Sequence, residues 1–311
     1  MATYLFAWNP VYWNWPELPR QIRRLGRNGH VDVQWASGRI RAIEPGSRAF
    51  MIRLGVPPKG IIGAGVTVTA PTEGEHWVAA KAAAGIPALV HALYLVNLAA
   101  PDDAIYSKSV DTMRATMDAA CAIEADAVIF HLGSHLGAGF ETGLERVVPA
   151  LRQVLERSNE RTWLLVENSA GAGGTIGRSI DELARITDRL DRHPRLGICL
   201  DSCHWYASGV DVTDSEVLDA AVVDLDAKVG LDRLRCLHVN DSQTPLGSNR
   251  DRHESVGRGL MGSGLHTFLS HPAFQELPAI METPGPDGHG PDAAELARLR
   301  ALHAGEPLAS D

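Results

Sequence analysis

Six apolar runs in this chain each end in a side chain that can bind a metal ion. Successive end residues are 34 to 44 residues apart, about the length of a strand, a helix and two loops. The repeat therefore predicts parallel βα units, and the carboxyl ends of parallel strands meet at one face, where such folds build their sites. The runs are Ala88–His91, Val128–His131, Trp163–Glu167, Leu196–Asp201, Leu234–His238 and Leu277–Glu282.

The length and composition fit a globular α/β protein. A chain of 311 residues suits one barrel, or one large and one small domain, and 45% hydrophobic residues suffice for a core. No apolar stretch approaches the roughly 20 residues of a membrane span, and Met1–Trp15 has no secretory pattern. The four cysteines lack CxxC spacing. We therefore expect a cytoplasmic protein with reduced thiols and no membrane partner.

Charge and tryptophan divide the chain into two pieces. The net charge is −9, but residues 1–76 hold nine basic and five acidic residues and four of the seven tryptophans. The remaining residues hold 20 basic and 33 acidic residues. We predict a basic, aromatic, β-rich segment over 1–76 with strands at 3–9, 48–54 and 60–69. An acidic metal-binding barrel follows over 77–304, and 305–311 form a tail. We also predict helices near 16–27 and at 107–123, 141–158, 179–190, 215–231, 264–271 and 293–304.

The predicted ligands are too numerous for a single metal ion. His204, Asp251 and His253 lie in loops and join the six strand-end residues His91, His131, Glu167, Asp201, His238 and Glu282. One zinc takes about four ligands, so nine ligands fit two or three ions. Three Zn²⁺ among four carboxylates would leave a charge of about +2, and clustered zincs activate water and polarise phosphoryl oxygens. The set favours phosphodiester hydrolysis.

Motifs in the same order along the chain resemble those of the endonuclease IV family of apurinic/apyrimidinic endonucleases. The resemblance spans roughly residues 80–300 and implies a tri-zinc TIM barrel. Such an enzyme cleaves double-stranded DNA 5′ to abasic sites and trims 3′-blocked ends in DNA repair. The motifs are His131–Gly137, Val166–Gly171, Cys199–His204, Leu237–Asp241, Gly247–His253 and Met281–Thr283.

The family resemblance also assigns roles to single residues. It implies three zinc ions per chain, with Mn²⁺ as a substitute metal. His91 and His131 would hold the first ion, and Glu167 would bridge it to a second ion that Asp201, His238 and Glu282 complete. His204, Asp251 and His253 would hold the third. Glu167 would also manage the proton of the attacking water. Tyr94 matches a position that packs at the abasic gap, or is a plain strand-end aromatic.

The arginines Arg250 and Arg252 flank Asp251. They either contact phosphate or are solvated loop residues.

The beginning of the chain departs from the family pattern. A complete barrel has eight strands; six βα units are recognisable, and the first two family units are not. Instead, the first segment resembles the opening of EVE-like domains of the PUA superfamily in three stretches, Tyr4–Pro10, Ile43–Phe50 and Lys59–Gly65. This resemblance implies a small β-barrel that reads modified bases. Trp13 and Trp15 either stack on a base or build a small core.

Three arrangements of the N-terminal piece are open. Its strands could complete the barrel wall, the barrel could stay an open arc that a partner chain covers, as in a homodimer, or the gene product could be recombined and impaired. A monomer remains the alternative to the homodimer.

Two other functions compete with DNA cleavage. The same barrel type also serves metal-dependent sugar isomerases and epimerases, whose sites use fewer metals and more carboxylates. Alternatively, the chain binds modified DNA with an inert or impaired barrel. Five histidines and the trio His204, Asp251 and His253 favour the hydrolase over the isomerase, and catalysis by the unmutated protein separates the hydrolase from the binding protein.

Overall fold

The chain divides into two compact units, Met1–His76 and Trp77–Asp311, in a computed structural model. The structure describes the strands Thr3–Trp8, Arg48–Arg53 and Gly60–Val66, and residues 87–283, 285 and 290–307. A helix predicted near residues 16–27 lies outside the described residues, as do Trp13 and Trp15.

In the first unit, three strands form a sheet of their own, at the places where the sequence predicts strands. β1 (Thr3–Trp8) pairs in parallel with β2 (Arg48–Arg53), which pairs antiparallel with β3 (Gly60–Val66). The identity of this unit as an EVE-like domain stays a prediction.

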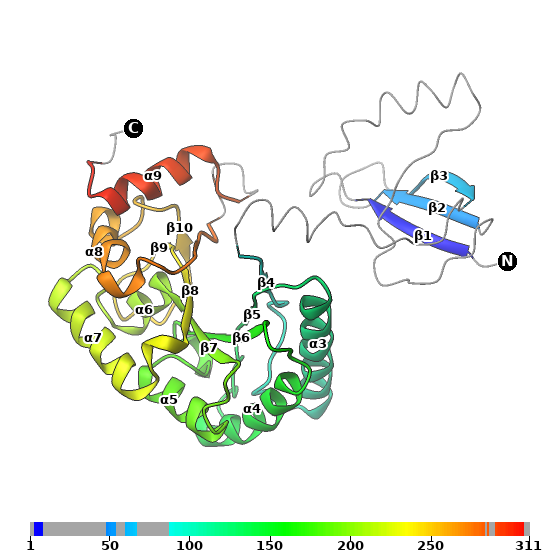
Figure 1. Cartoon of the computed structure of the whole chain (residues 1–311), viewed down its shortest axis with the longest axis horizontal. Coiled ribbons are helices and arrows are strands. Elements are labelled where there is room, and N and C mark those ends of the chain that lie inside the picture. Colours follow the sequence, from blue (N-terminus) through cyan, green and yellow to red (C-terminus); the bar gives the residue numbers. More distant parts are fainter. Residues whose placement is uncertain are drawn as a thin grey trace. The chain divides into compact units, whose positions relative to one another are not determined.

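The second unit is built on a six-stranded parallel sheet in which neighbours follow the chain order (Figure 1). This confirms the six predicted βα units of a TIM-type barrel, and β4 and β11 are the outermost strands of the described sheet. The strands are β4 (Leu89–His91), β5 (Ala127–Phe130), β6 (Trp163–Glu167), β7 (Leu196–Asp201), β8 (Leu234–His238) and β11 (Ala279–Ile280).

Helices cover the outer side of this curved sheet (Figure 1). Polar side chains cap the first turns of three of the four helices: Asp102, Ser179 and Asp214 each accept a backbone N–H of the helix that follows. The helices are α3 (Asp103–Ala122), α4 (Phe140–Leu155), α5 (Ile180–Arg189) and α7 (Ser215–Lys228). All four were predicted, with ends that differ by a few residues.

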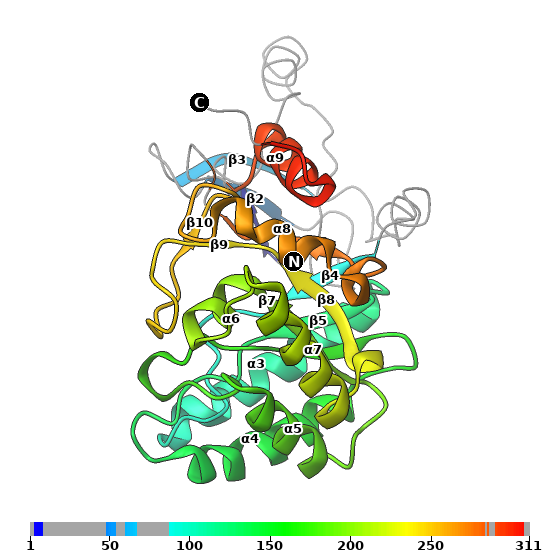
Figure 2. The ribbon, with the colours of Figure 1, turned by 90° about the vertical axis from the view of Figure 1, so that its left-hand side faces the viewer.

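Two further predicted helices lie in the carboxyl-terminal part, and several short elements that the sequence did not predict lie in the loops after β6 and beyond (Figure 2). The predicted helices are α8 (Leu265–Ser270) and α9 (Ala293–Ala304). The short elements are α6 (Ser202–Ser208), the hairpin strands β9 (Asp241–Ser242) and β10 (His253–Glu254), and the 3-10 turns η1 (Ala172–Gly174), η2 (Leu231–Arg233), η3 (Gly262–Gly264) and η4 (Pro272–Phe274).

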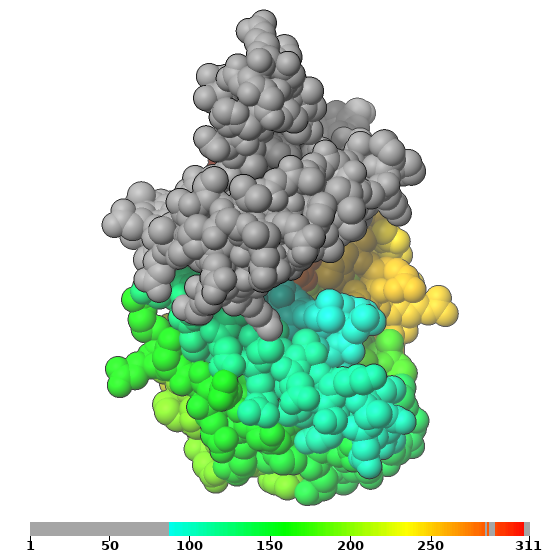
Figure 3. All heavy atoms as spheres, turned by 90° about the vertical axis from the view of Figure 1, so that its right-hand side faces the viewer, coloured from blue at the N-terminus to red at the C-terminus, as the bar shows by residue number. Residues whose placement is uncertain are grey.

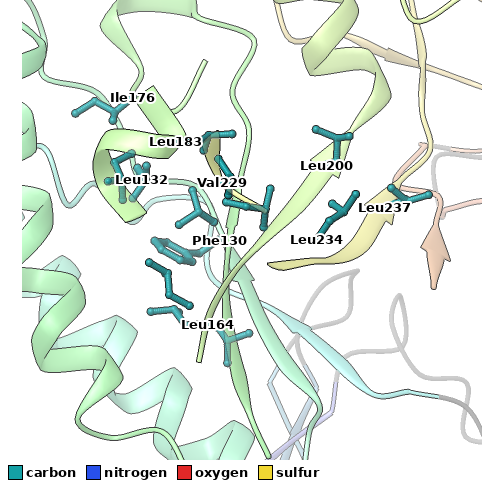
Figure 4. Packing of buried hydrophobic residues seen from close by; sticks show 14 of the residues in the cluster. Phe130, Leu132, Leu164, Ile176, Leu183, Leu200, Val229, Leu234 and Leu237 are labelled. Carbon is teal, nitrogen blue, oxygen red and sulfur yellow. The ribbon is translucent and has the colours of Figure 1, made fainter. Parts of the chain in front are cut away.

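Alternating side chains of the strands build two cores. Outward residues such as Phe130 and Leu164 pack against helix residues such as Leu183 in the larger cluster (Figure 4). Phe130 is 1% exposed, and burying a side chain of this kind contributes about 1.5–3 kcal/mol. Inward residues form a smaller cluster of Ala127, Ile129, Leu165, Cys199 and Cys236, with Leu89, Trp163 and Ile280 partly buried against it.

The inward residues aim the predicted ligands. Side chains two positions apart on a strand point to the same face. Each strand-end ligand follows an inward residue by two positions, and all six therefore point toward the barrel interior at one end. The inward residues one layer below the ligands are Leu89, Ile129, Leu165, Cys199, Cys236 and Ile280.

The outer surface of the helices is charged, and Figure 3 shows it from the side of α3. Ion pairs such as Arg157 with Asp118 and Arg189 with Glu145 join neighbouring helices. Because such pairs are exposed, they add little stability. None of the described helices is long and apolar enough to cross a membrane.

Candidate metal centre

The structure brings all nine predicted ligand residues into adjoining groups at the carboxyl ends of the strands. Within each group the candidate ligand atoms lie within 4.8 Å of one another. The groups are His91 with Glu167, His238 and Glu282; His131 with Glu167 and His204; Asp201 with His204 and His253; and Asp251 with His253 and Cys203.

Glu167 lies at the centre of the cluster and is fully buried. Its Oε2 is 3.1 Å from Nε2 of His91 and 3.5 Å from Nε2 of His131. Its Oε1 is 3.2 Å from Nδ1 of His204 and 3.1 Å from Nδ1 of His238. Each carboxylate oxygen thus faces its own pair of imidazoles, which is the arrangement of a carboxylate that can bridge two cations.

Glu282 approaches the same ring nitrogen of His238 that faces Glu167. Its Oε2 lies 3.0 Å from Nδ1 of His238, and its Oε1 lies 4.0 Å from Nε2 of His91. This residue follows β11 by two positions, so even a strand of two residues suffices to direct its carboxylate inward.

Asp251, His204 and His253 form a second focus. Oδ1 of Asp251 lies 3.2 Å from Nε2 of His204 and 3.2 Å from Nε2 of His253. Asp251 and His253 are two positions apart and face the same way, as the sequence predicted. They lie at the β9–β10 hairpin, whose strands pair antiparallel.

Asp201 places His204 through a local helix start. It ends β7, and its Oδ1 accepts the backbone N–H of His204 at 2.7 Å, which caps α6. The Asp-x-x-His spacing therefore puts a ligand in the first turn of a helix. The carboxylate also lies 3.8 Å from Nδ1 of His204 and 3.8 Å from Nε2 of His253.

Two buried asparagines hold the acidic ligands. Asn168 accepts the backbone N–H of Asp201 at 2.6 Å, and its amide donates to the carbonyl of Asp201. Asn240 donates to Oδ2 of Asp201 at 2.6 Å and accepts the backbone N–H of Glu282 at 2.8 Å. Such outer contacts orient metal ligands.

Asn168 directly follows the strand-end residue Glu167, and this position predicts a supporting role from the sequence alone. No role was predicted for Asn240, which lies two positions beyond the end of β8, and that position was the available signal.

Asp241 organises the loop beside the hairpin, a role that the sequence did not indicate. Its buried carboxylate accepts the backbone N–H groups of five residues: Ser242, Gly257, Gly259, Met261 and Gly262. A β-carbon at Gly259 would collide with this carboxylate, so the close approach requires glycine there.

Electrostatics in the cluster favour charged groups in spite of burial. Burial raises the pKa of Glu167, but contacts with three imidazoles hold it well below its usual range. Burial likewise opposes protonation of His238, yet Glu167 and Glu282 raise its pKa to about 11. The pKa of Asp251 falls to about 2 because His204 and His253 outweigh its burial. A cation that binds between these atoms must displace imidazole protons.

Two buried polar atoms at the centre of the cluster lack a hydrogen-bond partner in the part of the chain that the structure describes, as expected where a metal ion binds. Oε1 of Glu167 and Nδ1 of His238 have no hydrogen-bonded partner among the described residues. They lie 3.1 Å apart, but their orientation does not make a hydrogen bond. Unsatisfied buried donors and acceptors are costly, and imidazole nitrogens with carboxylate oxygens are the donors that zinc accepts. The residues therefore fit a zinc site.

The rim of the cluster is exposed. Tyr94 is 72% exposed, and its ring meets that of His131 edge-on with the centroids 5.8 Å apart. Arg250 and Arg252 are exposed, and neither forms an ion pair with a carboxylate within the described part of the chain. The structure thus brings Tyr94 to the site and leaves both guanidinium groups accessible to an anionic ligand.

Sequence comparison agrees with this geometry. A family model described as a xylose isomerase-like TIM barrel matches residues 44–302. The probable endonuclease 4 of Methanoculleus marisnigri is 41% identical over 227 residues, which cover 72% of this chain and 80% of that protein. The chain belongs to the endonuclease IV family.

Solved structures extend the comparison. Endonuclease IV from Thermus thermophilus is similar with a TM-score of 0.64 and 26% identity, over 98% of this chain and 99% of that one. A D-tagatose 3-epimerase-like protein reaches a TM-score of 0.55 at 15% identity over 74% of this chain and 81% of that one. The second likeness shows only that the endonuclease IV family shares its barrel with sugar-converting enzymes.

Proposed function

We propose that this chain is a zinc-dependent phosphodiesterase that cleaves double-stranded DNA 5′ to abasic sites and trims 3′-blocked ends. Membership in the endonuclease IV family supports this assignment. The strongest support is the position of the buried Glu167 carboxylate at the centre of nine convergent ligands. Each of its two oxygens lies close to two imidazoles.

The ligands divide naturally among three zinc ions. His91, His131 and Glu167 would hold the first ion. Glu167, Asp201, His238 and Glu282 would hold the second, and His204, Asp251 and His253 would hold the third. Mn²⁺ would serve as a substitute metal. When bound, the zinc ions lower the pKa of water and polarise the phosphoryl group.

Glu167 is the proposed catalytic residue. Glu167 is fully buried, which raises its pKa, but the surrounding imidazoles hold the pKa well below its usual range and keep the group ionised. The ionised carboxylate can take up the proton of the attacking water and release it again. The buried amide of Asn168 holds the backbone of Asp201, and that of Asn240 holds its carboxylate, so together they keep the reacting geometry constant.

The rim residues are proposed to hold the DNA. Tyr94 offers an exposed aromatic ring next to His131 at the entrance, where a ring can pack against bases that flank an abasic gap. Arg250 and Arg252 flank Asp251 of the third ligand group and carry positive charge that can contact phosphates.

The decisive experiment measures metal content and cleavage on the same preparation. We expect about three zinc ions per chain by elemental analysis and EDTA-sensitive nicking of a duplex that contains one abasic analogue, with the cut 5′ to the lesion. An undamaged duplex of the same sequence is the control. Nicking that survives exhaustive chelation contradicts the proposal.

The same protein preparation also tests two alternative functions. One metal per chain together with turnover of a ketose would indicate a sugar isomerase or epimerase. A protein that binds abasic DNA but never cleaves it would indicate an impaired binding module. The third ligand group, His204, Asp251 and His253, supports the hydrolase over the isomerase, and only measured cleavage separates the hydrolase from the binding module.

We propose further that the basic and aromatic segment 1–76 reads modified bases, and that the protein acts in the cytoplasm as a monomer or an edge-covering homodimer. Substitution of Trp13 and Trp15 by alanine in the full chain should weaken binding to a duplex with modified bases and leave cleavage at abasic sites unchanged. Equal binding by both proteins contradicts the first proposal, and light scattering in solution distinguishes the two oligomeric states.

A further inference from the structure

Two cysteines lie directly beneath the ligand cluster. Cys199 on β7 and Cys236 on β8 are fully buried and free. They belong to the inward cluster one layer below the strand-end ligands, where the four other positions are leucine or isoleucine. The DNA-cleavage chemistry proposed above makes no use of these thiols.

A β-bulge brings the two thiols together. Ile198 pairs with Leu234, and the next residue of β7, Cys199, pairs with Cys236, so Arg235 is the extra residue. Without the bulge, Cys199 would face Arg235, whose side chain is exposed and lies over the ring of Trp163. Bulges re-aim side chains next to functional sites, and this one places two thiols side by side inside the barrel.

His238 supplies a third possible ligand beside the two thiols. It follows Cys236 by two positions and therefore points to the same face. A nitrogen of its ring and the two sulfurs all lie within 4.8 Å of one another. Two sulfurs and one imidazole are soft to borderline donors, in contrast to the carboxylates of the cluster above, and thiolates select soft cations over hard ones.

We propose that Cys199, Cys236 and His238 form a separate site for one thiophilic cation such as Cd²⁺, Hg²⁺ or Cu⁺. Binding of Cd²⁺ forms two S–Cd bonds and releases both thiol protons to solvent, with no change of oxidation state. Because His238 also belongs to the group with Glu167 and Glu282, the cation competes with zinc for this imidazole. Thiophilic metals that bind at this site would therefore displace zinc from the neighbouring cluster.

The test is a titration of the full-length, chelator-stripped protein with Cd²⁺ alone, followed by sulfur-to-cadmium charge-transfer absorption. We expect a band that saturates at one equivalent in the wild type and is lost in Cys199→Ala and in Cys236→Ala. Alanine is already found at Ala127 in the same cluster, and circular dichroism checks the fold of each variant. Cys121→Ala, outside this group, is the matched control and should keep the band.

Cys203 needs its own control, because it lies with Asp251 and His253 at the third ligand group. A band that disappears in Cys203→Ala and persists in Cys236→Ala overturns the proposal, as does a wild type without any band. Cadmium-113 NMR of the unmutated protein gives a second readout: a shift typical of two sulfur donors supports the site, and a shift typical of only nitrogen and oxygen donors overturns it.

Competition for His238 has a separate readout. Addition of Cd²⁺ to zinc-loaded protein should release more zinc from the wild type than from Cys236→Ala, as a chromogenic chelator measures. Equal release overturns the sharing of His238. None of these measurements uses DNA, so their failure leaves the proposed cleavage activity untouched, and a failure to nick DNA leaves the thiol site untouched.

Discussion

The floor and the rim of the metal centre differ in how their geometry is fixed. On the floor, Glu167 and Asp201 are fully buried and His204 and His238 are 1% exposed. At the rim, Tyr94 is 72% exposed, and Arg250 and Arg252 are exposed as well. Strands and buried amides hold the floor before any ligand arrives, whereas rim side chains acquire partners only from the substrate. Floor substitutions should therefore abolish chemistry, and rim substitutions should tune binding.

The largest expected effect is that of Glu167→Gln on the floor. The amide keeps the shape but removes the charge that faces four imidazoles, and we expect cleavage to fall by about 10⁴-fold. Single-turnover nicking of an abasic duplex measures the rate, and elemental analysis measures the zinc that is lost with it. Glu145→Gln, on an exposed helix surface, should change neither. A Glu167→Gln protein that cleaves within tenfold of the wild-type rate would contradict a catalytic role for this buried carboxylate.

Asp251→Asn tests the second focus. Its carboxylate oxygen lies 3.2 Å from both His204 and His253, so the neutral amide should cost the third zinc and about 10²- to 10³-fold in rate. We expect zinc content to fall from about three to about two per chain. Full zinc content at the wild-type rate would show that this group does not hold a metal.

Asn240→Ala alters the buried floor of the site without removing a metal ligand, so it tests whether the support of the ligands matters. The substitution leaves Oδ2 of the buried Asp201 without its donor and the N–H of Glu282 without its acceptor. We expect a loss of about 10- to 100-fold in metal affinity or activity. Asn159→Ala, in a loop away from the cluster, serves as control. Unchanged affinity and activity would mean that Asp201 and Glu282 need no support.

At the rim, Tyr94→Ala should weaken binding to the abasic duplex by about 1 kcal/mol, roughly fivefold, because a stacking surface is lost. Tyr94→Phe keeps the ring and should bind like the wild type. Thermal unfolding should be the same for all three proteins, since the side chain is exposed. Equal binding by the alanine variant would identify Tyr94 as a plain strand-end aromatic.

The smallest expected effect belongs to the arginines. If Arg250 contacts one phosphate, Arg250→Gln should reduce the slope of log affinity against log salt by about 0.9, and Arg252→Gln should act in the same way. Arg161→Gln, on the outer surface of the barrel, should not change the slope. Identical slopes for all variants would place both loop arginines in solvent.

The strand-borne part of the site could be predicted from the sequence. Period-two alternation within a strand fixes which side chains face inward, so His131, Glu167 and His238 could be assigned to one face before their distances were known. The same logic reached Asp251 and His253, although they lie outside the regular repeat.

The rest depends on contacts between distant segments. α6 and the β9–β10 hairpin are too short to leave a periodic pattern. Asn240 reaches Asp201 and Glu282 across 39 and 42 residues of chain, and a local pattern carries no signal for such pairs. The bulge at Cys199 depends on the register between two strands, which a single sequence does not determine.

A crystal structure of the zinc-soaked protein, with anomalous diffraction recorded at the zinc edge, would locate the bound ions. We expect anomalous peaks among the nine ligands, with one peak on either side of Glu167 and a third beside Asp251. A map without peaks at this cluster, at full zinc concentration, would contradict a zinc centre at this site.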